Sequence, residues 1–582
     1  MNVTPKFNIN YVKNKKIDLD SLEKSYKPSN DDLENDYNPF RLSKIQNYNP
    51  IYQAFFELND KNYDSISLNH RYHFSELSKV FDNEEKVYLK KPVFIKYSPL
   101  IDPFRYMSGK YDITAEDIRV LPKPKEIRSD ALPKLMEKNN ASYIDNFFSY
   151  LNDKLMSEHN IMNGVEYYGS FLTVQDKFKV NIADDLDYLN SSEYFLKNNK
   201  KLFTLSNIGK DEFMNYGSRS NKSKLIISNT RHNITAISIN DTLDDIECSS
   251  LDTSVDISNN NLIYENNKSA SKSSDTTNNS ETNYSDDEEQ DFTDDDESND
   301  DDDESNKDDE EDESRQEEYQ DSDEYVSESD EENIYAYIND FPVQFICLEK
   351  CDGTLDELFM GDEMDVKKAA SALMQIVMTL IIFQKAFQFT HNDLHTNNVM
   401  YVNTDIEFLY YKYNNQVYKV PTYGKIFKII DFGRSIYKYK GNLFCSDSFA
   451  PSGDAHSQYN FEPFVNMDKP RLEPNYSFDL CRLGCSIYDF MIDNDNNTSK
   501  FDELQKTIYR WCTDDNKKNI LYKKNGEERY PNFKLYKMIA RTVHTHGPSE
   551  QLDFPYFKQF LIQGKSKKYK NVMDIDNIPC YV

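Results

Sequence analysis

Two clusters of polar residues in the second half of the chain have the residue types and spacing needed to handle a phosphate group. The first is the run HNDLHTNN at residues 391–398, which follows a long apolar segment. The second is DFG at residues 431–433, which follows the apolar run IFKII. Carboxylate and amide oxygens are the ligands that Mg2+ selects, and a loop carboxylate can also accept a proton. These residues favour metal-assisted phosphoryl transfer, because that reaction depends on positioning and charge neutralisation more than on covalent catalysis.

Taken together, the two clusters resemble the catalytic loop (H-x-D-x-x-x-x-N) and the metal-binding turn (D-F-G) of the protein kinase superfamily. The resemblance implies that Asp393 is the catalytic residue that accepts the proton of the acceptor hydroxyl, and that Asn398 and Asp431 hold Mg2+. It also implies ATP as cofactor and a bilobal α+β fold with a small β-rich N-lobe and a larger helical C-lobe. The form D-L-H-x-x-N is similar to haspin-like kinases and to aminoglycoside and other small-molecule phosphotransferases. The resemblance implies a serine/threonine kinase, and the insertions, with a composition typical of AT-rich coding DNA, favour one similar to those of giant viruses.

Two stretches of the first half resemble parts of the kinase N-lobe. The run VFIK at residues 93–96 is similar to the strand whose lysine holds the nucleotide phosphates, which assigns that role to Lys96. Residues 139–155 have apolar side chains at the spacing of an amphipathic helix, where kinases place a helix whose glutamate pairs with that lysine. This helix has no glutamate, so Asp145 beside the apolar stripe is the expected partner, with a solvated aspartate as the alternative. Asp153 is expected on the polar face, beside Lys154.

The apolar run FPVQFICL at residues 341–348 predicts a strand, and the residues that follow resemble the linker between kinase lobes, where backbone groups bind adenine. Glu349 and Cys351 are expected to face the base, and Leu348 to shape the pocket behind it. His395 stands where the resemblance expects a lysine next to the transferred phosphate, and a neutral imidazole brings no fixed charge at pH 7. Asn392 replaces the arginine that receives an activation-loop phosphate, so no such phosphoswitch is expected.

Composition and motifs predict five segments. They are a polar N-terminal extension (1–84), a kinase-like N-lobe with an ordered insertion (85–235), a disordered acidic insertion (236–333), the last N-lobe strand and hinge (334–352), and a kinase-like C-lobe (353–582). Residues 286–332 carry a charge of −27 out of a total of −33, so the rest of the chain carries only about −6. A segment with so much charge and so few aromatic residues cannot bury enough apolar area to fold. Residues 407–421 alternate around Asn414-Asn415 and predict a hairpin inserted between the two clusters.

The sequence also departs from the kinase pattern. No G-x-G-x-x-G precedes Lys96, no glycine occurs before Gly109, and no A-P-E follows Gly433. Three alternatives remain open: an active serine/threonine protein kinase, a pseudokinase that serves as a binding scaffold, and a small-molecule kinase. Asp479, at the start of an apolar helix, matches the kinase aspartate that braces the catalytic loop, and an ordinary helix cap is a compatible reading.

Cysteine usage and charge limit the compartment and partners. Eight cysteines without CxxC spacing indicate free thiols in a reducing compartment, and thus the cytoplasm or nucleus of a host cell, or the virion. The N-terminus lacks the apolar core of a signal peptide, and the apolar run at residues 372–383 is too short to span a bilayer and contains Gln375. We expect a protein substrate, no nucleic acid and no membrane, and we expect the acidic insertion to bind a basic partner.

Overall fold

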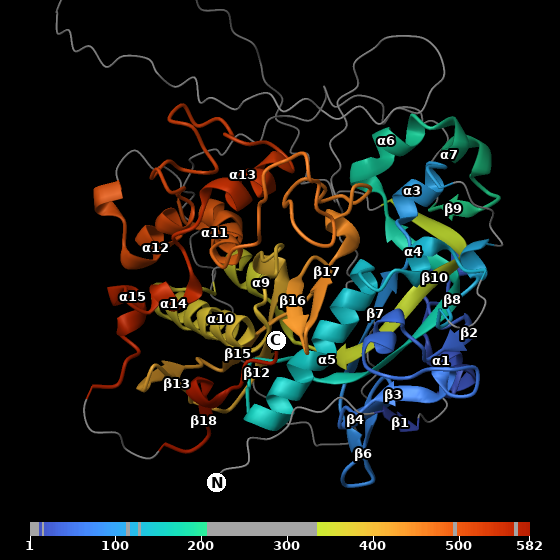
Figure 1. Ribbon diagram of the computed structural model, residues 1–582, viewed down its shortest axis with the longest axis horizontal. Coiled ribbons are helices and arrows are strands. Elements are labelled where there is room, and N and C mark those ends of the chain that lie inside the picture. The colour runs from blue at the N-terminus through green and yellow to red at the C-terminus, as the bar shows by residue number, and fades with distance from the viewer. Residues whose placement is uncertain are drawn as a thin grey trace, which may run out of the picture. The chain divides into compact units, whose positions relative to one another are not determined.

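The computed structural model describes residues 11–13, 17–111, 117–125, 130–206, 334–361, 363–492, 498–563 and 569–582. These residues form a mixed α+β structure with several sheets and helices (Figure 1). They belong to one compact unit, Met1–Ser269 with Asn333–Val582, whereas the second unit, Ala270–Glu332, lies outside the described residues. The predicted disordered insertion at 236–333 and the last part of the predicted ordered insertion, 207–235, likewise lie outside them.

The main antiparallel sheet has the strand order β2-β8-β10-β7, with β9 (Phe203–Leu205) paired to β10. Its two long strands, β8 (Tyr167–Asn181) and β10 (Tyr335–Glu349), are rich in β-branched and aromatic residues and are buried over most of their length. β7 (Val93–Pro99) forms one edge of this order and places Phe94 opposite Leu348. β2 (Leu42–Gln46) pairs with β8, so a strand from the first 84 residues joins the same sheet.

Helix α5 (Ala141–His159) packs against β8 and β10 (Figure 1) and agrees with the helix predicted over 139–155. The side chain of Asn140 accepts a hydrogen bond from Ser142 N and so caps the first turn, and Asn160 ends the helix in the left-handed region at φ 54°. Tyr581 approaches the other end of α5, where its hydroxyl lies 2.6 Å from His159 Nε2. Both ends of the helix are therefore fixed by contacts with other parts of the chain.

Helix α10 (Val366–Phe387) is the most apolar helix and is capped by Asp365, whose carboxylate accepts the N–H groups of Lys367 and Lys368. Within the described ranges it is the one helix long and apolar enough to cross a membrane, which corrects the shorter apolar run expected from the sequence. Its most apolar window is 83% buried inside the protein, as the core helix of a globular domain would be.

The predicted hairpin is confirmed as β13 (Phe408–Tyr413) and β14 (Gln416–Pro421), with Asn414 and Asn415 both at positive φ in the turn. In the sequence the hairpin is inserted between β12 (Val399–Asn403) and β15 (Lys425–Ile429), which pair with each other. β12 follows residues 391–398, and β15 leads to Asp431. The segment after Gly433, for which the sequence indicated no strands, forms the hairpin β16 (Ile436–Tyr439) and β17 (Asn442–Cys445).

The helices α11 (Phe478–Met491), α12 (Glu503–Trp511) and α13 (Lys534–Thr542) follow in the last third of the chain, and α11 packs against both of the others. The remaining helices and strands are short: β1 (Tyr11–Lys13), α1 (Leu19–Ser25), α2 (Asn30–Glu34), β3 (Ile66–Leu68), β4 (Tyr72–Glu76), β5 (Lys79–Asp82), β6 (Val87–Lys90), α3 (Pro103–Met107), α4 (Pro133–Met136), α6 (Leu186–Asn190), α7 (Glu193–Asn198), β11 (Gly353–Thr354), α9 (Leu355–Met360), α14 (Pro548–Gln551), α15 (Pro555–Lys558) and β18 (Val572–Asp574).

Candidate active site

Lys96 lies at the centre of the site, on β7, and forms ion pairs with two carboxylates from distant parts of the sequence. Its Nζ atom is 2.9 Å from Asp145 Oδ2 on α5 and 2.7 Å from Asp431 Oδ1, just after β15. Burial alone would lower the pKa of Lys96, but the attraction of both carboxylates outweighs it and raises that pKa. Burial raises the pKa of Asp145, whereas Lys96 outweighs burial at Asp431 and lowers the pKa of that carboxyl. The structure thus brings together three residues that span more than 300 positions of the sequence.

Asp145 has a second contact that the sequence did not indicate. Its Oδ1 atom accepts the backbone N–H of Phe432 at 2.8 Å. Asp145 therefore ties the lysine of β7 and the DFG turn to the same helix. The turn itself is unusual, since Asp431 lies at φ 63°, a conformation that aspartate and asparagine tolerate better than most residues. Backbone strain of this kind is often found at functional sites.

Asp479, the second residue of α11, holds the start of the segment 391–398 in place. Its two carboxylate oxygens accept the backbone N–H groups of His391 and Asn392, each at 2.9 Å. Asp479 is fully buried and lies inside the helix rather than at its cap, because the N-cap position belongs to Ser477. Of the two readings of Asp479 from the sequence, the geometry matches the brace of the loop.

Asp393 is contacted on both carboxylate oxygens. The hydroxyl of Tyr536, on α13, donates to Oδ1 at 2.6 Å, and Nη1 of Arg434 lies 3.5 Å from Oδ2. Burial raises the pKa of Tyr536 to about 12, so this hydroxyl stays protonated near neutral pH and acts as a donor. Arg434 also pairs with Asp454, at 2.5 Å. Asn398 lies beside Asp393, with its Nδ2 atom donating to the Asp393 carbonyl at 3.0 Å.

His395 is partly buried next to Asp393. Burial lowers the pKa of its imidazole to about 4, although the carboxylate of Asp393 opposes this shift. The side chain is therefore neutral at pH 7, as expected from its type. Asn392 is buried as well, and its Oδ1 atom accepts a hydrogen bond from Tyr459 at 2.8 Å.

Two cavities share Lys96, Asp145 and Asp431 in their walls. The smaller has a volume of about 60 Å3 and is lined also by Leu348, Glu349 and Cys351, the three residues predicted to surround a base. Phe94 forms part of the same wall. Glu349 is not free in this cavity, because its carboxylate pairs with the buried Lys428 at 2.6 Å. The larger cavity, of about 260 Å3, extends from Lys96 toward α3 and α4.

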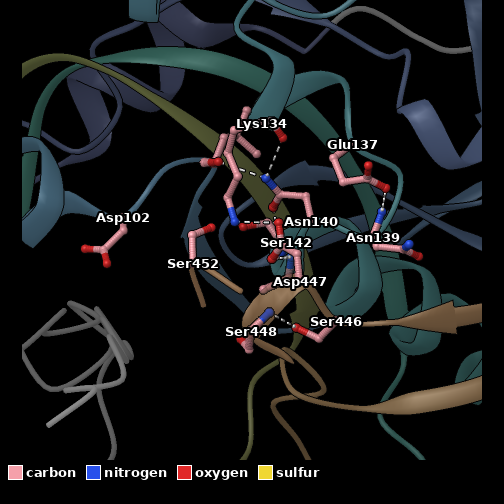
Figure 2. Close-up of polar contacts among 12 residues, drawn as sticks. Asp102, Lys134, Glu137, Asn139, Asn140, Ser142, Ser446, Asp447, Ser448 and Ser452 are labelled. Atoms are coloured by element: carbon pink, nitrogen blue, oxygen red, sulfur yellow. Dashed lines mark hydrogen bonds and ion pairs between the residues drawn. The ribbon is translucent and has the colours of Figure 1, made fainter. Parts of the chain in front are cut away.

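Asp447 joins the first turn of α5 to the segment 446–454, as Figure 2 shows. One of its carboxylate oxygens accepts the N–H of Ala141 at 3.0 Å, and the other pairs with Lys134. Ser142 ties the same turn to β7 by donating to the Pro99 carbonyl at 2.6 Å. Since Asp145 lies one turn further along α5, these contacts fix where its carboxylate meets Lys96.

Asp153 corrects one sequence expectation. It was placed on the polar face of the helix, but only 5% of its surface is exposed and its Oδ1 atom accepts the N–H of Tyr167 at 3.1 Å. Burial raises the pKa of this carboxyl to about 7. The helix is buried on nearly all sides because β8 and the hairpin β16–β17 cover it, so its polar stripe does not mark a solvent face.

The sequence did not single out Tyr536, Arg482, Lys134 or Asp447 as site residues. Each reaches the site only through tertiary contacts, and no motif in the sequence includes it. Within the described part of the chain, no group of three or more His, Cys, Asp or Glu side chains is arranged to hold a metal ion. The seven described cysteines are free thiols.

Comparison with known proteins gives partial matches. No family model matches the chain. The chain is 33% identical over 132 residues to the serine/threonine-protein kinase haspin of Mus musculus, which is 22% of this chain and 17% of that protein. Haspin of Bos taurus gives 33% over 132 residues, 22% of this chain and 16% of the relative. The chain therefore has a kinase-like relationship over this part.

A viral protein is similar to the same extent. The uncharacterized protein 098R of Invertebrate iridescent virus 6 is 31% identical over 152 residues, which cover 25% of this chain and 22% of the relative. In all three comparisons the matched part spans less than a quarter of the relative's length.

Proposed function

We propose that the protein is a divergent serine/threonine protein kinase that transfers a phosphoryl group from ATP to hydroxyls of a protein substrate. The observation that carries this proposal is the double ion pair of Lys96 with Asp145 and Asp431. Phosphoryl transfer in kinases requires a lysine paired with a helix carboxylate, and next to it an aspartate that holds Mg2+, and these ion pairs bring residues of those types together. The partial similarity to haspin supports the same reaction class.

In this proposal the described elements form two lobes. The sheet β2-β8-β10-β7 with α5 constitutes the N-lobe, and α10, α11 and the helices after them constitute the C-lobe, with residues 349–352 as the hinge. Residues 1–84 are then more than an extension, since β2 adds to the N-lobe sheet. Residues 236–333 form the acidic insertion, and we propose a basic protein as its partner.

Each site residue has a defined task. Asp393 accepts the proton of the acceptor hydroxyl, and Tyr536 and Arg434 orient its carboxylate. Asp479 keeps the loop in place by holding two backbone N–H groups. Lys96 contacts phosphate oxygens, and Asp145 keeps the lysine extended toward them.

The residues fit Mg2+ and ATP at the phosphate end. Lys96 contacts Oδ1 of Asp431, which leaves Oδ2 for a cation, and Asn398 donates through Nδ2, which leaves its amide oxygen available as a ligand. Both are hard oxygen ligands. When bound, ATP supplies the phosphoryl group and Mg2+ neutralises its charge. The N–H groups of Glu349 and Lys350 already donate to the carbonyls of Glu166 and Pro92, so the backbone of Cys351, next to Leu348, would hold the base.

A second candidate, a pseudokinase acting as a binding scaffold, is favoured by one observation. The cavity next to Leu348 and Cys351 is only about 60 Å3, whereas ligand pockets usually measure roughly 300–1,000 Å3. Phe94 forms part of the wall of this cavity, where the base would lie. A protein whose pocket does not admit a nucleotide would keep the kinase fold without its reaction.

The experiment that tests the proposal uses labelled ATP, Mg2+ and a mixture of protein substrates. We expect label on serine and threonine residues with the wild-type protein and at least a 100-fold lower rate with Asp393→Asn, which keeps the shape of the side chain but cannot accept the proton. Transfer to aminoglycosides or sugars without transfer to protein would instead establish a small-molecule kinase. No transfer to either class, together with no nucleotide binding by calorimetry, would establish the scaffold.

The seven described free thiols are consistent with a protein that works in a reducing intracellular compartment.

A further inference from the structure

The catalytic loop itself brings no fixed positive charge to the acceptor side of the site. His395 occupies the position where the kinase pattern has a lysine, and burial keeps this imidazole neutral at pH 7. Lys96 does not fill this role, because it is already paired with the carboxylates of Asp145 and Asp431. Negative charge on a transferring phosphoryl group is stabilised best by preorganised donors in a site that excludes water. Another cation near Asp393 would therefore have a clear chemical task.

Arg482 lies where such a cation is needed. It is on α11, three residues after Asp479, so both side chains lie on the face of the helix that meets the catalytic loop. Its Nε atom donates to the hydroxyl of Tyr536 at 2.9 Å, and that hydroxyl donates to Asp393 Oδ1 at 2.6 Å. The guanidinium also lies 5.1 Å from the centre of the Tyr536 ring. One side chain therefore separates Arg482 from the proton acceptor.

The guanidinium of Arg482 forms no direct ion pair in the described part of the chain. Burial lowers its pKa, but Tyr536 and Asp393 outweigh burial and raise that pKa, so Asp393 attracts the guanidinium from beyond the Tyr536 hydroxyl. Within the described residues no carboxylate forms a salt bridge with it, and its hydrogen bond to Tyr536 uses only Nε. Arg434, in contrast, has both Asp393 and Asp454 as partners. Leaving an arginine partly buried and without an anion is costly, so such residues are usually paired. The two Nη groups form a fork that suits two phosphate oxygens.

We propose that Arg482 is a catalytic residue that contacts the transferred phosphoryl group and supplies the positive charge that His395 does not. This inference rests on the proposed function. During transfer, the bond between the phosphorus and the leaving oxygen of ATP breaks and a bond to the acceptor oxygen forms, while the proton of the acceptor hydroxyl passes to Asp393. Arg482 stays protonated throughout and donates hydrogen bonds to the phosphoryl oxygens.

The decisive test removes the positive charge at Arg482 and then places a lysine at position 395 of the loop. Arg482→Gln removes the charge, and we expect kcat to fall by about 100-fold with the KM for ATP changed by less than about 3-fold. The double variant R482Q/H395K restores a cation at the loop position and is expected to recover at least a factor of about 10. Arg510→Gln is the matched control, because Arg510 also lies over an aromatic ring, that of Phe554, and donates one side-chain hydrogen bond. It should leave kcat unchanged.

A purely structural role gives a different pattern. If Arg482 acted only by holding Tyr536, Tyr536→Phe would lower kcat as much as R482Q, and H395K would rescue neither. That result, or a kcat for R482Q within about 3-fold of wild type, would overturn the inference. Melting temperatures of R482Q and R510Q are compared first, so that loss of folded protein is not counted as loss of catalysis.

A binding measurement separates this inference from the proposed function. Inorganic phosphate, compared with chloride at equal ionic strength, is expected to raise the melting temperature of the wild-type protein and not of R482Q. Equal stabilisation of both proteins would overturn the role of Arg482, even in an active kinase. Stabilisation that depends on Arg482 in a protein without any transferase activity would support the phosphate contact and refute the proposed reaction.

Discussion

Replacing Asp447 by alanine tests how the site is held together. Asp447 accepts the N–H of Ala141 at the start of α5 and pairs with Lys134 (Figure 2). Its own N–H donates to the Asn139 carbonyl at 2.8 Å, a contact that the alanine variant keeps. The substitution therefore removes the anion at the helix N-terminus without removing the backbone link.

The size of the effect follows from these contacts. A hydrogen bond between a charged carboxylate and a buried N–H is worth about 1.5–3 kcal/mol. The side chain of Lys134 is 37% exposed, so water compensates most of its loss and the ion pair adds well under about 1 kcal/mol. We expect a total loss of about 2–3 kcal/mol, which corresponds to a fall in Tm of roughly 2–3 °C, because the entropy of unfolding is large for a unit of several hundred residues.

Hydrogen exchange shows whether the loss of stability is located at the start of α5. Amides in the first two turns of α5, residues 141–148, should exchange faster in D447A, whereas those of α10 should not change. Asp365→Ala is the matched control, because Asp365 caps α10 with hydrogen bonds of 2.8 and 2.9 Å. It should affect α10 and leave α5 protected. Unchanged exchange in α5 of D447A would refute the claim that segment 446–454 fixes this helix.

Two further predictions concern Asp153 and Phe94. Because burial raises the pKa of Asp153 from 3.8 to about 7, the folded chain binds more protons than the unfolded chain between about pH 4 and 7, and this carboxyl destabilises the fold as pH rises through that range. Asp153→Asn keeps an acceptor for Tyr167 N, so its Tm advantage over wild type should grow from pH 5 to pH 8; a constant difference would contradict the assigned pKa. Phe94→Ala enlarges the 60 Å3 cavity, and calorimetry should show tighter binding of Mg-ADP than in wild type, whereas equal or weaker binding would mean that Phe94 does not limit the pocket.

The sequence was informative wherever a short pattern was sufficient. The periodicity of residues 139–155 predicted α5, and Asn414-Asn415 predicted the turn between β13 and β14, because helix faces and tight turns depend on neighbours a few positions apart. The spacing of residues 391–398 and 431–433 favours a phosphate-handling loop, and this stays a prediction. The strands β16 and β17 were missed, although both are rich in apolar and aromatic residues, since strands of four residues are too short to give a clear alternation.

The tertiary structure decided which of these residues meet. The sequence offered Asp145 as a weak partner for Lys96, and packing of α5 against β8 and β10 brought its carboxylate to 2.9 Å and also to Phe432 N. Asp153, eight residues further along the same helix, is buried as well, because a helix covered on several sides has no polar face for a sequence pattern to reveal.

Sequence alone therefore determined the reaction class worth testing, because the identity and order of Asp393, Asn398 and Asp431 limit the chemistry. Only the tertiary structure decided which groups surround that chemistry. Tyr536 and Arg482 come from separate helices and reach Asp393 through contacts over long sequence distances. Such contacts depend on how whole elements pack, and side-chain type or spacing along the chain does not specify them.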